Sequence, residues 1–434
     1  MLLLYNLLLG LATLFLVPYY GGKMLLTGKY RKGLGQRLGF RLPEAIAHLQ
    51  GSPRLWIHAV SVGEVTAAAP IIASLRESLP GATIVLSTTT ETGQAMARRI
   101  VTGADACIYY PLDLPFAVRR VITAVRPDVF VLTETELWPN FIKSCQTRKI
   151  KIVMANGRLS PRSFRRYART RFFWRGILSA LDAVGAISER DAERFRLIGL
   201  PPGRLSVTGN TKYDSLAARA SAVLEEEMRG RLAMGREERV LVAGSTHAGE
   251  EEIVLALYGE LLPIFPDLKL IIVPRHVERA ALVHALVREK GFADCLLLTE
   301  IAADKRRRHE RVIIVDVIGE LFPIYSLATV VFCGGSLVPK GGQNILEAAA
   351  WGKVIFYGPF MDDFQEERSL LEEAGAGVTV RDREELQAGV LKMLADPEDL
   401  ARRGEAGRRL VAANRGAAGR NAALIMGLLP SDAV

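Results

Sequence analysis

Residues 330–350 read VVFCGGSLVPKGGQNILEAAA, and this stretch decides the expected fold. A short β-branched run breaks at the glycines of 334–335 and again at 341–342 before a helical pattern begins. A buried parallel strand followed by a glycine-rich turn lets the backbone approach a ligand, and the N–H groups that open the next helix attract an anion. Glycine spacing alone favours an ordinary strand–loop–helix turn, so the interpretation depends on the rest of the chain.

Apolar runs alternate with amphipathic helices through the body of the chain, which predicts an α/β protein with doubly wound parallel sheets. The predicted strands of the first half are Leu55–Val60, Thr83–Ser87, Val129–Thr133, Ile150–Met154, Ala183–Ile187 and Leu205–Val207. Those of the second half are Val240–Ala243, Lys269–Val273, Cys295–Leu298, Val312–Val315, Thr329–Phe332, Val354–Tyr357 and Gly377–Val380. A charged stretch separates the halves. We therefore expect a Rossmann-like domain over 23–210, a linker over 211–238 and a second Rossmann-like domain over 239–434, facing a cleft.

The first 20 residues contain no charged side chain, and tyrosines stand near both ends of this segment. A run of this length can cross a bilayer, so we predict a membrane anchor over residues 1–22. A cleaved signal peptide would need a basic start and a small-residue cleavage site, and neither is evident. A buried core helix stays open as an alternative, because Asn6 and Gly10 interrupt the run.

Positive charge follows the apolar segment. Residues 21–50 carry six basic side chains against Glu44, which is over half of the net charge of +9. The six are Lys23, Lys29, Arg31, Lys32, Arg37 and Arg41. This asymmetry predicts that the body lies in the cytoplasm against anionic headgroups. The four cysteines are scattered without a CxxC pair, which argues against a disulfide framework or a zinc site.

Acidic residues follow two predicted strands. Glu64 ends the segment SVGE after the strand 55–60, where it can act as a general base or simply complement a helix dipole. Glu134 and Glu136 follow the strand 129–133, together with a tryptophan, and burying two acids there without a purpose would be costly.

Cations and one histidine follow other strands. Pro274-Arg275-His276 follows the strand 269–273, and Lys212 follows the strand 205–207. Arginine and lysine at strand ends suit a phosphate group. His247 could contact a substrate, but a lone histidine more often caps a helix, and the six histidines lack the paired spacing of a metal site.

Seven arginines and no acid lie between Lys151 and Arg175, interleaved with aromatic residues. Four of them, Arg158, Arg162, Arg165 and Arg166, are candidate contacts to an acceptor or to lipid. Basic-aromatic helices bind membrane surfaces or nucleic acids, and the apolar N-terminus favours lipid and argues against nucleic acid.

These features together resemble the 3-deoxy-D-manno-octulosonic acid (Kdo) transferases of lipopolysaccharide synthesis. The resemblance covers almost the whole chain. It rests on YRKGLGQRLGF (30–40), HAVSVGE (58–64), ETELWPN (134–140), ANGRLS (155–160), GNTKYD (209–214), AGSTHAGEEE (243–252), IIVPRHVERA (271–280), GGSLVPKGGQNILEAAAWG (334–352) and YGPFMDDF (357–364). The chain departs from the family pattern at Gly33-Leu34-Gly35-Gln36, away from the proposed chemistry.

The resemblance implies a GT-B glycosyltransferase that moves Kdo from CMP-Kdo to a lipid A precursor, lipid IVA, at the inner membrane. Transfer would invert the anomeric centre and use neither a metal nor a cofactor. Glu64 would be the general base, with Glu134 and Lys212 stabilising the transition state. The implied CMP-Kdo-binding residues are Pro274, Arg275, Ile318, Gly319, Glu320, Gly335, Ser336, Asn344, Ile345, Leu346 and Glu347.

Two rival functions stay open at this point. The same fold hosts other nucleotide-sugar transferases and epimerases. The second rival is a membrane-bound protein that binds a nucleotide sugar without catalysis. Such a protein would need Arg275 and Asn344 but no general base, so the presence of Glu64 argues against it. The number of Kdo units added and the oligomeric state do not follow from the sequence.

Overall fold

The computed structural model describes residues 2–27, 33–42, 44–47, 49–303 and 310–430. The chain divides into two compact units. The N-terminal unit comprises residues 1–215 together with 414–434, and the C-terminal unit comprises 216–413. Each unit is a parallel seven-stranded sheet with helices on both faces, as the alternation of strands and helices predicted.

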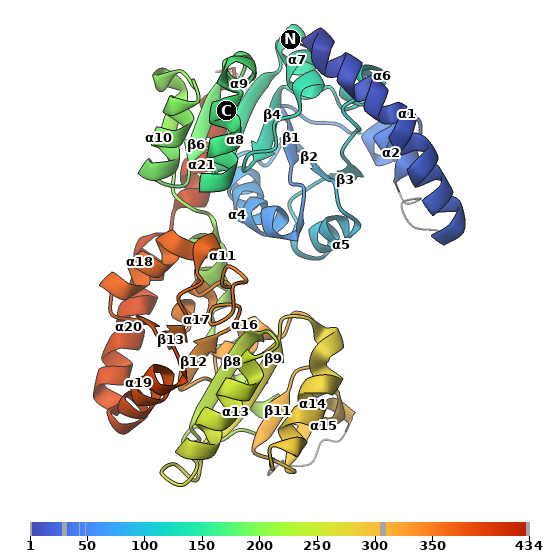
Figure 1. Ribbon diagram of the computed structural model, residues 1–434. Coiled ribbons are helices and arrows are strands. Elements are labelled where there is room, and N and C mark those ends of the chain that lie inside the picture. The colour runs from blue at the N-terminus through green and yellow to red at the C-terminus, as the bar shows by residue number, and fades with distance from the viewer. Residues whose placement is uncertain (1, 28–32, 43, 48, 304–309, 431–434) are drawn as a thin grey trace. The chain divides into compact units, whose positions relative to one another are not determined.

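The N-terminal sheet has the strand order β3-β2-β1-β4-β5-β6-β7 (Figure 1). Its strands are β1 (Arg54–His58), β2 (Thr83–Thr88), β3 (Ala106–Tyr109), β4 (Val129–Thr133), β5 (Lys151–Gly157), β6 (Ala183–Ala186) and β7 (Leu205–Val207). The chain adds strands in one direction from β1 to β3 and then in the other direction from β4 to β7, so β1 and β4 are neighbours. Their carboxyl ends define the switch point of the sheet. The short edge strand β3 was not predicted.

Helices cover both faces of this sheet, and alternate residues of each strand pack against opposite layers. Trp56 of β1 packs with α6 (Pro115–Val125), α7 (Pro139–Thr147) and α10 (Glu189–Leu197). Its neighbours Leu55 and Ile57 pack on the other face with α4 (Val62–Ser78), α5 (Glu91–Ile100) and α21 (Ala417–Met426). The basic helices α8 (Pro161–Arg169) and α9 (Arg171–Leu178), and the short α2 (Leu34–Arg37) and α3 (Glu44–Ala47), complete the layers. Ser188 caps α10, because its hydroxyl accepts from Asp191 N at 3.2 Å.

The C-terminal sheet has the order β10-β11-β9-β8-β12-β13-β14. Its strands are β8 (Val240–Thr246), β9 (Lys269–Pro274), β10 (Cys295–Leu297), β11 (Val312–Ile314), β12 (Val330–Cys333), β13 (Val354–Tyr357) and β14 (Gly377–Thr379). Helices α13 (Glu250–Leu261), α14 (Ala280–Glu289) and α19 (Arg383–Ala395) bury their apolar faces on one side. The remaining helices are α11 (Lys212–Arg219), which begins in the N-terminal unit, and α12 (Ala222–Leu232), α15 (Leu298–Ala303), α16 (Leu321–Tyr325), α17 (Leu346–Ala350), α18 (Gln365–Glu373) and α20 (Pro397–Ala413).

The end of the chain corrects the expected domain boundaries. Residues 414–434 belong to the N-terminal unit instead of the C-terminal domain, because α21 buries Ala422 and Ile425 against the N-terminal sheet. The Asp214 carboxylate accepts from Gly416 N at 2.6 Å and Ala418 N at 2.9 Å, and so caps α21. The expected linker 211–238 is also mostly helical, formed by α11 and α12.

The apolar N-terminal segment forms the long helix α1 (Leu2–Thr27). Residues Leu2–Lys23 are long and apolar enough to span a membrane, with mean hydropathy 1.9 and none of the window buried, which is weak evidence for membrane association. The polar interruption contacts the body of the unit. Tyr5 donates to Asp113 Oδ2 at 2.9 Å, and Asn140 Nδ2 donates to Asn6 Oδ1 at 2.7 Å.

The basic stretch after α1 is only partly a surface feature. Lys29, Arg31 and Lys32 lie outside the described residues. Arg37 differs from the expectation, because its guanidinium folds inward, donates to the Thr89 carbonyl and stacks over the Tyr109 ring at 4.7 Å. Burial lowers the pKa of Arg37. This side chain holds α2 on the sheet and does not face headgroups.

Candidate functional site

Glu64 lies in the first turn of α4, directly after β1, and is 8% exposed. Its Oε2 accepts from Val60 N at 2.8 Å and from Thr133 Oγ1 at 3.5 Å, while Oε1 accepts from Ser61 Oγ at 3.2 Å. The pKa of Glu64 is raised to about 8, chiefly by burial; the charges of Glu134 and Glu136 act in the same direction, and the hydrogen bonds from Val60 N and Ser61 Oγ act against it. A carboxyl with this pKa can take up a proton near neutral pH.

Glu134 follows β4, the neighbour of β1, in a left-handed conformation with φ 57°. A non-glycine residue in this region is strained, and such strain is concentrated at functional sites. Glu134 N donates to Ala155 O at 3.0 Å, so the turn is pinned to β5. The structure therefore brings Glu64 and Glu134 together at the switch point, close enough for their charges to interact.

Lys212 begins α11 beyond the end of β7, three strands from β4. The preceding residue turns back toward the centre of the sheet, because Thr211 N and Oγ1 donate to Asn156 Oδ1 at 3.0 and 3.1 Å. Asn156 belongs to β5, has φ 53° and donates its N–H to Asn421 Oδ1 of α21. Asn156 thus holds the loop that carries Lys212, a role that the sequence reasoning missed.

Each unit contains a bulge-like irregularity in one strand of its sheet. In β5 the pairing register shifts between Met154 and Gly157, and in β8 it shifts between Gly244 and Thr246. The residues within these irregularities, Asn156 and Ser245, have φ 53° and 56°. Bulges re-aim side chains near active sites. Both strands also extend beyond their predicted ends, Met154 and Ala243. The predictions ended the strands there because less apolar residues follow, and the structure continues each strand through a bulge.

The glycine-rich turn after β12 is already filled by a carboxylate from the chain. Glu250 is fully buried, and its oxygens accept from Gly335 N at 2.7 Å, Ser336 N at 3.0 Å and Leu337 N at 3.0 Å. The N–H groups of Gly335 and Ser336, expected to face CMP-Kdo, are therefore occupied by Glu250. Ser336 Oγ accepts from Gly358 N at 2.8 Å and stabilises the turn. In the sequence, the acidic run GEEE (249–252) is the feature that could have indicated this carboxylate.

Arg275 follows Pro274, the last residue of β9, and its N–H donates to Thr246 O at 3.0 Å. Asn344 precedes α17, where its Oδ1 accepts from Leu346 N at 3.2 Å and its amide donates to Glu347 Oε1 at 3.1 Å. Burial raises the pKa of Glu347, while the charges of Arg219 and Arg275 act in the opposite direction. Arg275, Asn344 and Glu347 therefore lie near one another at the carboxyl edge of the C-terminal sheet.

The side chains of Ile345 and Leu346 are buried in the core and hold α17 in place. Ile318 lies after β11, and its side chain is 86% exposed. Gly319 follows with φ 94°, and Glu320 pairs with Arg231 at 2.7 Å.

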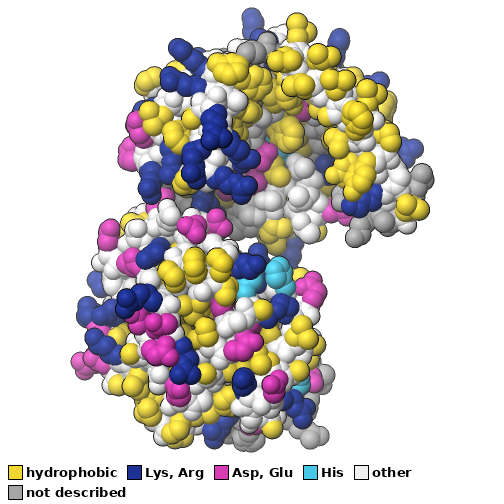
Figure 2. All heavy atoms as spheres, viewed as in Figure 1, with side chains coloured by type: hydrophobic (Ala, Val, Ile, Leu, Met, Phe, Trp, Pro, Cys, Tyr) yellow, Lys and Arg dark blue, Asp and Glu magenta, His cyan; other side chains and the backbone are white. Residues whose placement is uncertain are grey.

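The arginines of α8 and α9 lie on the surface of the N-terminal unit, where Figure 2 shows basic side chains gathered together. Arg162, Arg165 and Arg166 are exposed, whereas Arg158 is half-buried. The interleaved aromatic residues behave differently from one another. Phe164, Tyr167 and Trp174 pack on the core, and Phe172 is 69% exposed.

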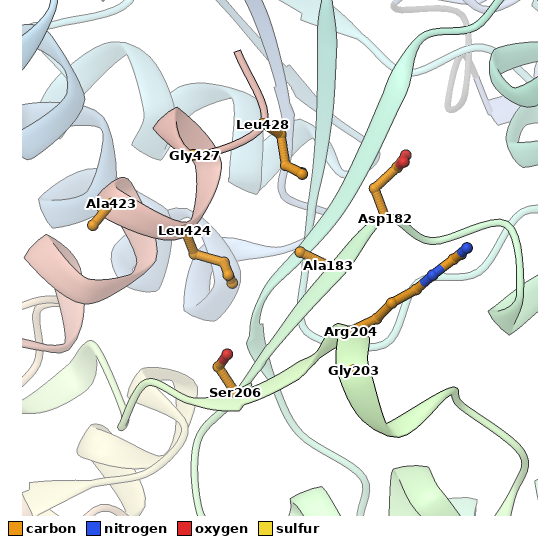
Figure 3. Close-up of a pocket in the computed structure, with 9 residues that line it drawn as sticks. All are labelled: Asp182, Ala183, Gly203, Arg204, Ser206, Ala423, Leu424, Gly427 and Leu428. Atoms are coloured by element: carbon orange, nitrogen blue, oxygen red, sulfur yellow. The ribbon is translucent and has the colours of Figure 1, made fainter. Parts of the chain in front are cut away.

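A pocket of about 310 Å³ lies elsewhere, between α21 and the amino ends of β6 and β7 (Figure 3). Asp182, Arg204 and Ser206 line it together with residues of α21. Since Glu64 and Glu134 follow the carboxyl ends of their strands, this pocket is not part of their site. Within the described part of the chain, no group of three or more His, Cys, Asp or Glu side chains could hold a metal ion.

Residues 32–215 match the family model described as "3-Deoxy-D-manno-octulosonic-acid transferase (kdotransferase)". The chain is 34% identical over 391 residues to a 3-deoxy-D-manno-octulosonic acid transferase of Haemophilus influenzae, covering 90% of both chains. It is 30% identical over 401 residues to the enzyme of the same name from Chlamydophila psittaci, covering 92% of this chain and 90% of that one.

Among solved structures, a glycosyltransferase from Rickettsia africae is similar with a TM-score of 0.57 and 14% identity, covering 87% of this chain and 98% of that one. This likeness shows the fold, which is the GT-B fold expected from the sequence. The identity to the Haemophilus enzyme over nine tenths of both chains shows more than the fold. The chain therefore belongs to the family of 3-deoxy-D-manno-octulosonic acid transferases, which are glycosyltransferases.

Proposed function

We propose that the protein transfers Kdo from CMP-Kdo to a lipid A precursor, lipid IVA, with inversion at the anomeric carbon and Glu64 as general base. The observation that carries the proposal is the environment of Glu64. A buried carboxyl beside two other acids, with its pKa raised to about 8, is poised for proton uptake at the carboxyl edge of a GT-B sheet.

In the proposed step, a hydroxyl oxygen of the acceptor attacks the anomeric carbon of Kdo. The new C–O bond forms as the bond from that carbon to the CMP phosphate oxygen breaks, and CMP leaves with the bonding electrons. The hydroxyl proton passes to Glu64. Attack on the face opposite the leaving group inverts the centre. Glu134 stabilises the positive charge that develops on the sugar ring. Its fixed, strained backbone conformation holds the carboxylate in position for this role.

The leaving phosphate gains negative charge, and we assign its compensation to Arg275, Lys212 and the start of α17 at Asn344. These cations can offset the charge that a divalent ion offsets in other transferases, so the proposed reaction needs no metal. We assign the ribose and the base of the nucleotide to two further groups. Glu347 can accept hydrogen bonds from the ribose hydroxyls, and the exposed turn Ile318-Gly319 can contact the base.

The acceptor carries phosphates and acyl chains, and the surface of the N-terminal unit offers groups for both. The apolar residues of α1 are exposed, and Tyr5 lies 6.3 Å from the Phe173 ring of α9, so α1 and the arginine helices are adjacent. We assign Arg162, Arg165 and Arg166, with Arg158, to contacts with anionic lipid. We assign the enzyme to the cytoplasmic side of the inner membrane, because basic side chains follow the apolar segment in the sequence.

A transfer assay tests the proposal. The full-length protein is incubated with freshly generated CMP-Kdo and tetraacylated lipid A precursor, with and without EDTA, and the products are weighed by mass spectrometry. We expect mass increments of whole Kdo units, unaffected by EDTA. Parallel incubation with UDP-N-acetylglucosamine tests the fold-level alternative. Epimerisation of that sugar without Kdo transfer would refute the proposal.

A further inference from the structure

Two histidines follow neighbouring strands of the C-terminal sheet. His247 comes after β8 and His276 after β9, and their ring centroids lie 5.8 Å apart at an interplanar angle of 83°. The Arg275 N–H bond to Thr246 O ties the two strand ends together. Figure 2 shows histidine side chains beside basic ones at one edge of this unit.

His247 is held rigidly against the glycine-rich turn. Its backbone N–H donates at 2.9 Å to Glu250 Oε2, the oxygen that also accepts from Gly335 N. A Cβ atom at Gly335 would lie 3.4 Å from His247 Nε2 and 3.5 Å from Gln343 Nε2. The imidazole ring and the Gln343 amide therefore converge over a residue that has no side chain.

The surroundings of the His247 ring suit an anion. Its Nε2 is buried and has no hydrogen-bond partner among the residues that the structure describes. Desolvation lowers the pKa of His247, and the charges of His276, Lys340 and Arg279 lower it further, although Glu250 opposes them. Arg279 is paired with Glu251 at 2.6 Å, whereas Lys340 is exposed. A buried polar atom without a partner, near the exposed ammonium group of Lys340, indicates a missing anionic ligand.

We propose that His247 and Lys340 bind the carboxylate of the donor's acidic sugar, with His247 Nε2 as the hydrogen-bond donor. The inference rests on the proposed donor, CMP-Kdo. In that molecule the carboxylate and the phosphate oxygen are attached to the same anomeric carbon, so their two binding sites must adjoin. The order β9-β8-β12 meets this requirement. Arg275 follows β9, His247 follows β8, and the glycine-rich turn follows β12.

This arrangement gives the protein a way to distinguish an acidic sugar from a neutral one. CMP alone can use Arg275 and Asn344, but only the intact donor reaches His247. A His247→Gln variant keeps a polar side chain and loses the imidazole donor in its native position. We expect this variant to raise the KM for CMP-Kdo about tenfold or more, as loss of a charge-assisted hydrogen bond does.

The test compares KM for CMP-Kdo with the inhibition constant of CMP, which lacks the sugar. We expect His247→Gln and Lys340→Met each to raise KM while leaving the CMP constant within about twofold. Lys340 is exposed, so its variant stays informative if the histidine variant folds poorly. The matched control is His284→Gln on α14, which should change neither constant. A donor analogue with a carboxamide should lose the difference between wild type and His247→Gln.

Unchanged KM in both variants would overturn the inference. So would a parallel rise of KM and of the CMP constant, which would place His247 in the nucleotide site or in a structural role. Failure of the wild-type protein to transfer Kdo is a separate outcome, because it would refute the proposed function itself.

Discussion

Replacing Glu64 with glutamine separates its catalytic role from its structural one. The folded pKa of about 8 lies well above the ordinary value of 4.5, so the folded state favours the protonated carboxyl. The resulting destabilisation is absent below about pH 4.5, grows as pH rises and is complete above about pH 8. At pH 7 these two pKa values correspond to a penalty of about 3 kcal/mol.

Glutamine removes that penalty and keeps an oxygen for Val60 N. We therefore expect Glu64→Gln to stabilise the N-terminal unit by roughly 1–3 kcal/mol at pH 7, or about 2–4 °C in Tm per kcal/mol for a unit of this size. Transfer should fall by about 10²–10⁴-fold, the range for loss of a general base. CMP binding should be unchanged, because the proposed nucleotide-binding residues Arg275 and Asn344 lie in the other unit.

The assays are single-turnover Kdo transfer, thermal unfolding and CMP titration, each on wild type, Glu64→Gln and the exposed control Glu77→Gln from the same helix. Wild-type kcat/KM should rise about tenfold per pH unit up to about pH 8 and then level off. The variant's residual rate should lack this rise. A destabilised Glu64→Gln protein, or equal loss of transfer and CMP binding, would refute the reasoning.

Four further outcomes follow from the structure. Glu134→Gly removes the strain of a positive φ and should stabilise the fold by about 1 kcal/mol in urea unfolding while transfer falls; unchanged transfer would contradict its role. Glu250→Ala leaves buried N–H groups without an acceptor and should cost about 3 kcal/mol or more, so an unaltered urea midpoint would contradict the bracing role. Tyr5→Phe loses one bond to Asp113 of about 1 kcal/mol and should speed proteolysis within α1; equal cleavage rates would show that the contact does not hold the helix. Alanine at Arg162, Arg165 and Arg166 of α8 should weaken binding to anionic vesicles by about 1 kcal/mol per residue at low salt, with no change on neutral vesicles.

Much of the fold follows from local sequence. The central strands are continuous apolar runs bounded by turn residues, and their prediction is confirmed. The edge strand β3 reads ACIY and was not predicted, although the shorter edge strand β7 was. Glu64 and Glu134 are predictable as strand-end acids, but their proximity depends on which strands become neighbours. That order is a property of the folded sheet.

The remaining features depend on contacts distant in sequence. Glu250 and Gly335 are 85 residues apart, and no local pattern shows that one fills the turn formed by the other. Asn156 and Asn421 are 265 residues apart. Arg37 has the composition of a surface cation, yet it packs inside on Tyr109. In each case a polar side chain satisfies backbone groups that would otherwise be buried unpaired, a requirement visible only in three dimensions.

The return of α21 to the first unit has a consequence for synthesis. The C-terminal unit is a single uninterrupted segment, whereas the N-terminal sheet waits for Ala422 and Ile425 to cover one of its faces. Domains made first ordinarily fold first on the ribosome. Here the N-terminal unit, although it is synthesised first, is completed after the C-terminal unit. The inserted unit can finish folding while the earlier one still exposes apolar surface, and the N-terminal sheet is covered only after α21 has been synthesised.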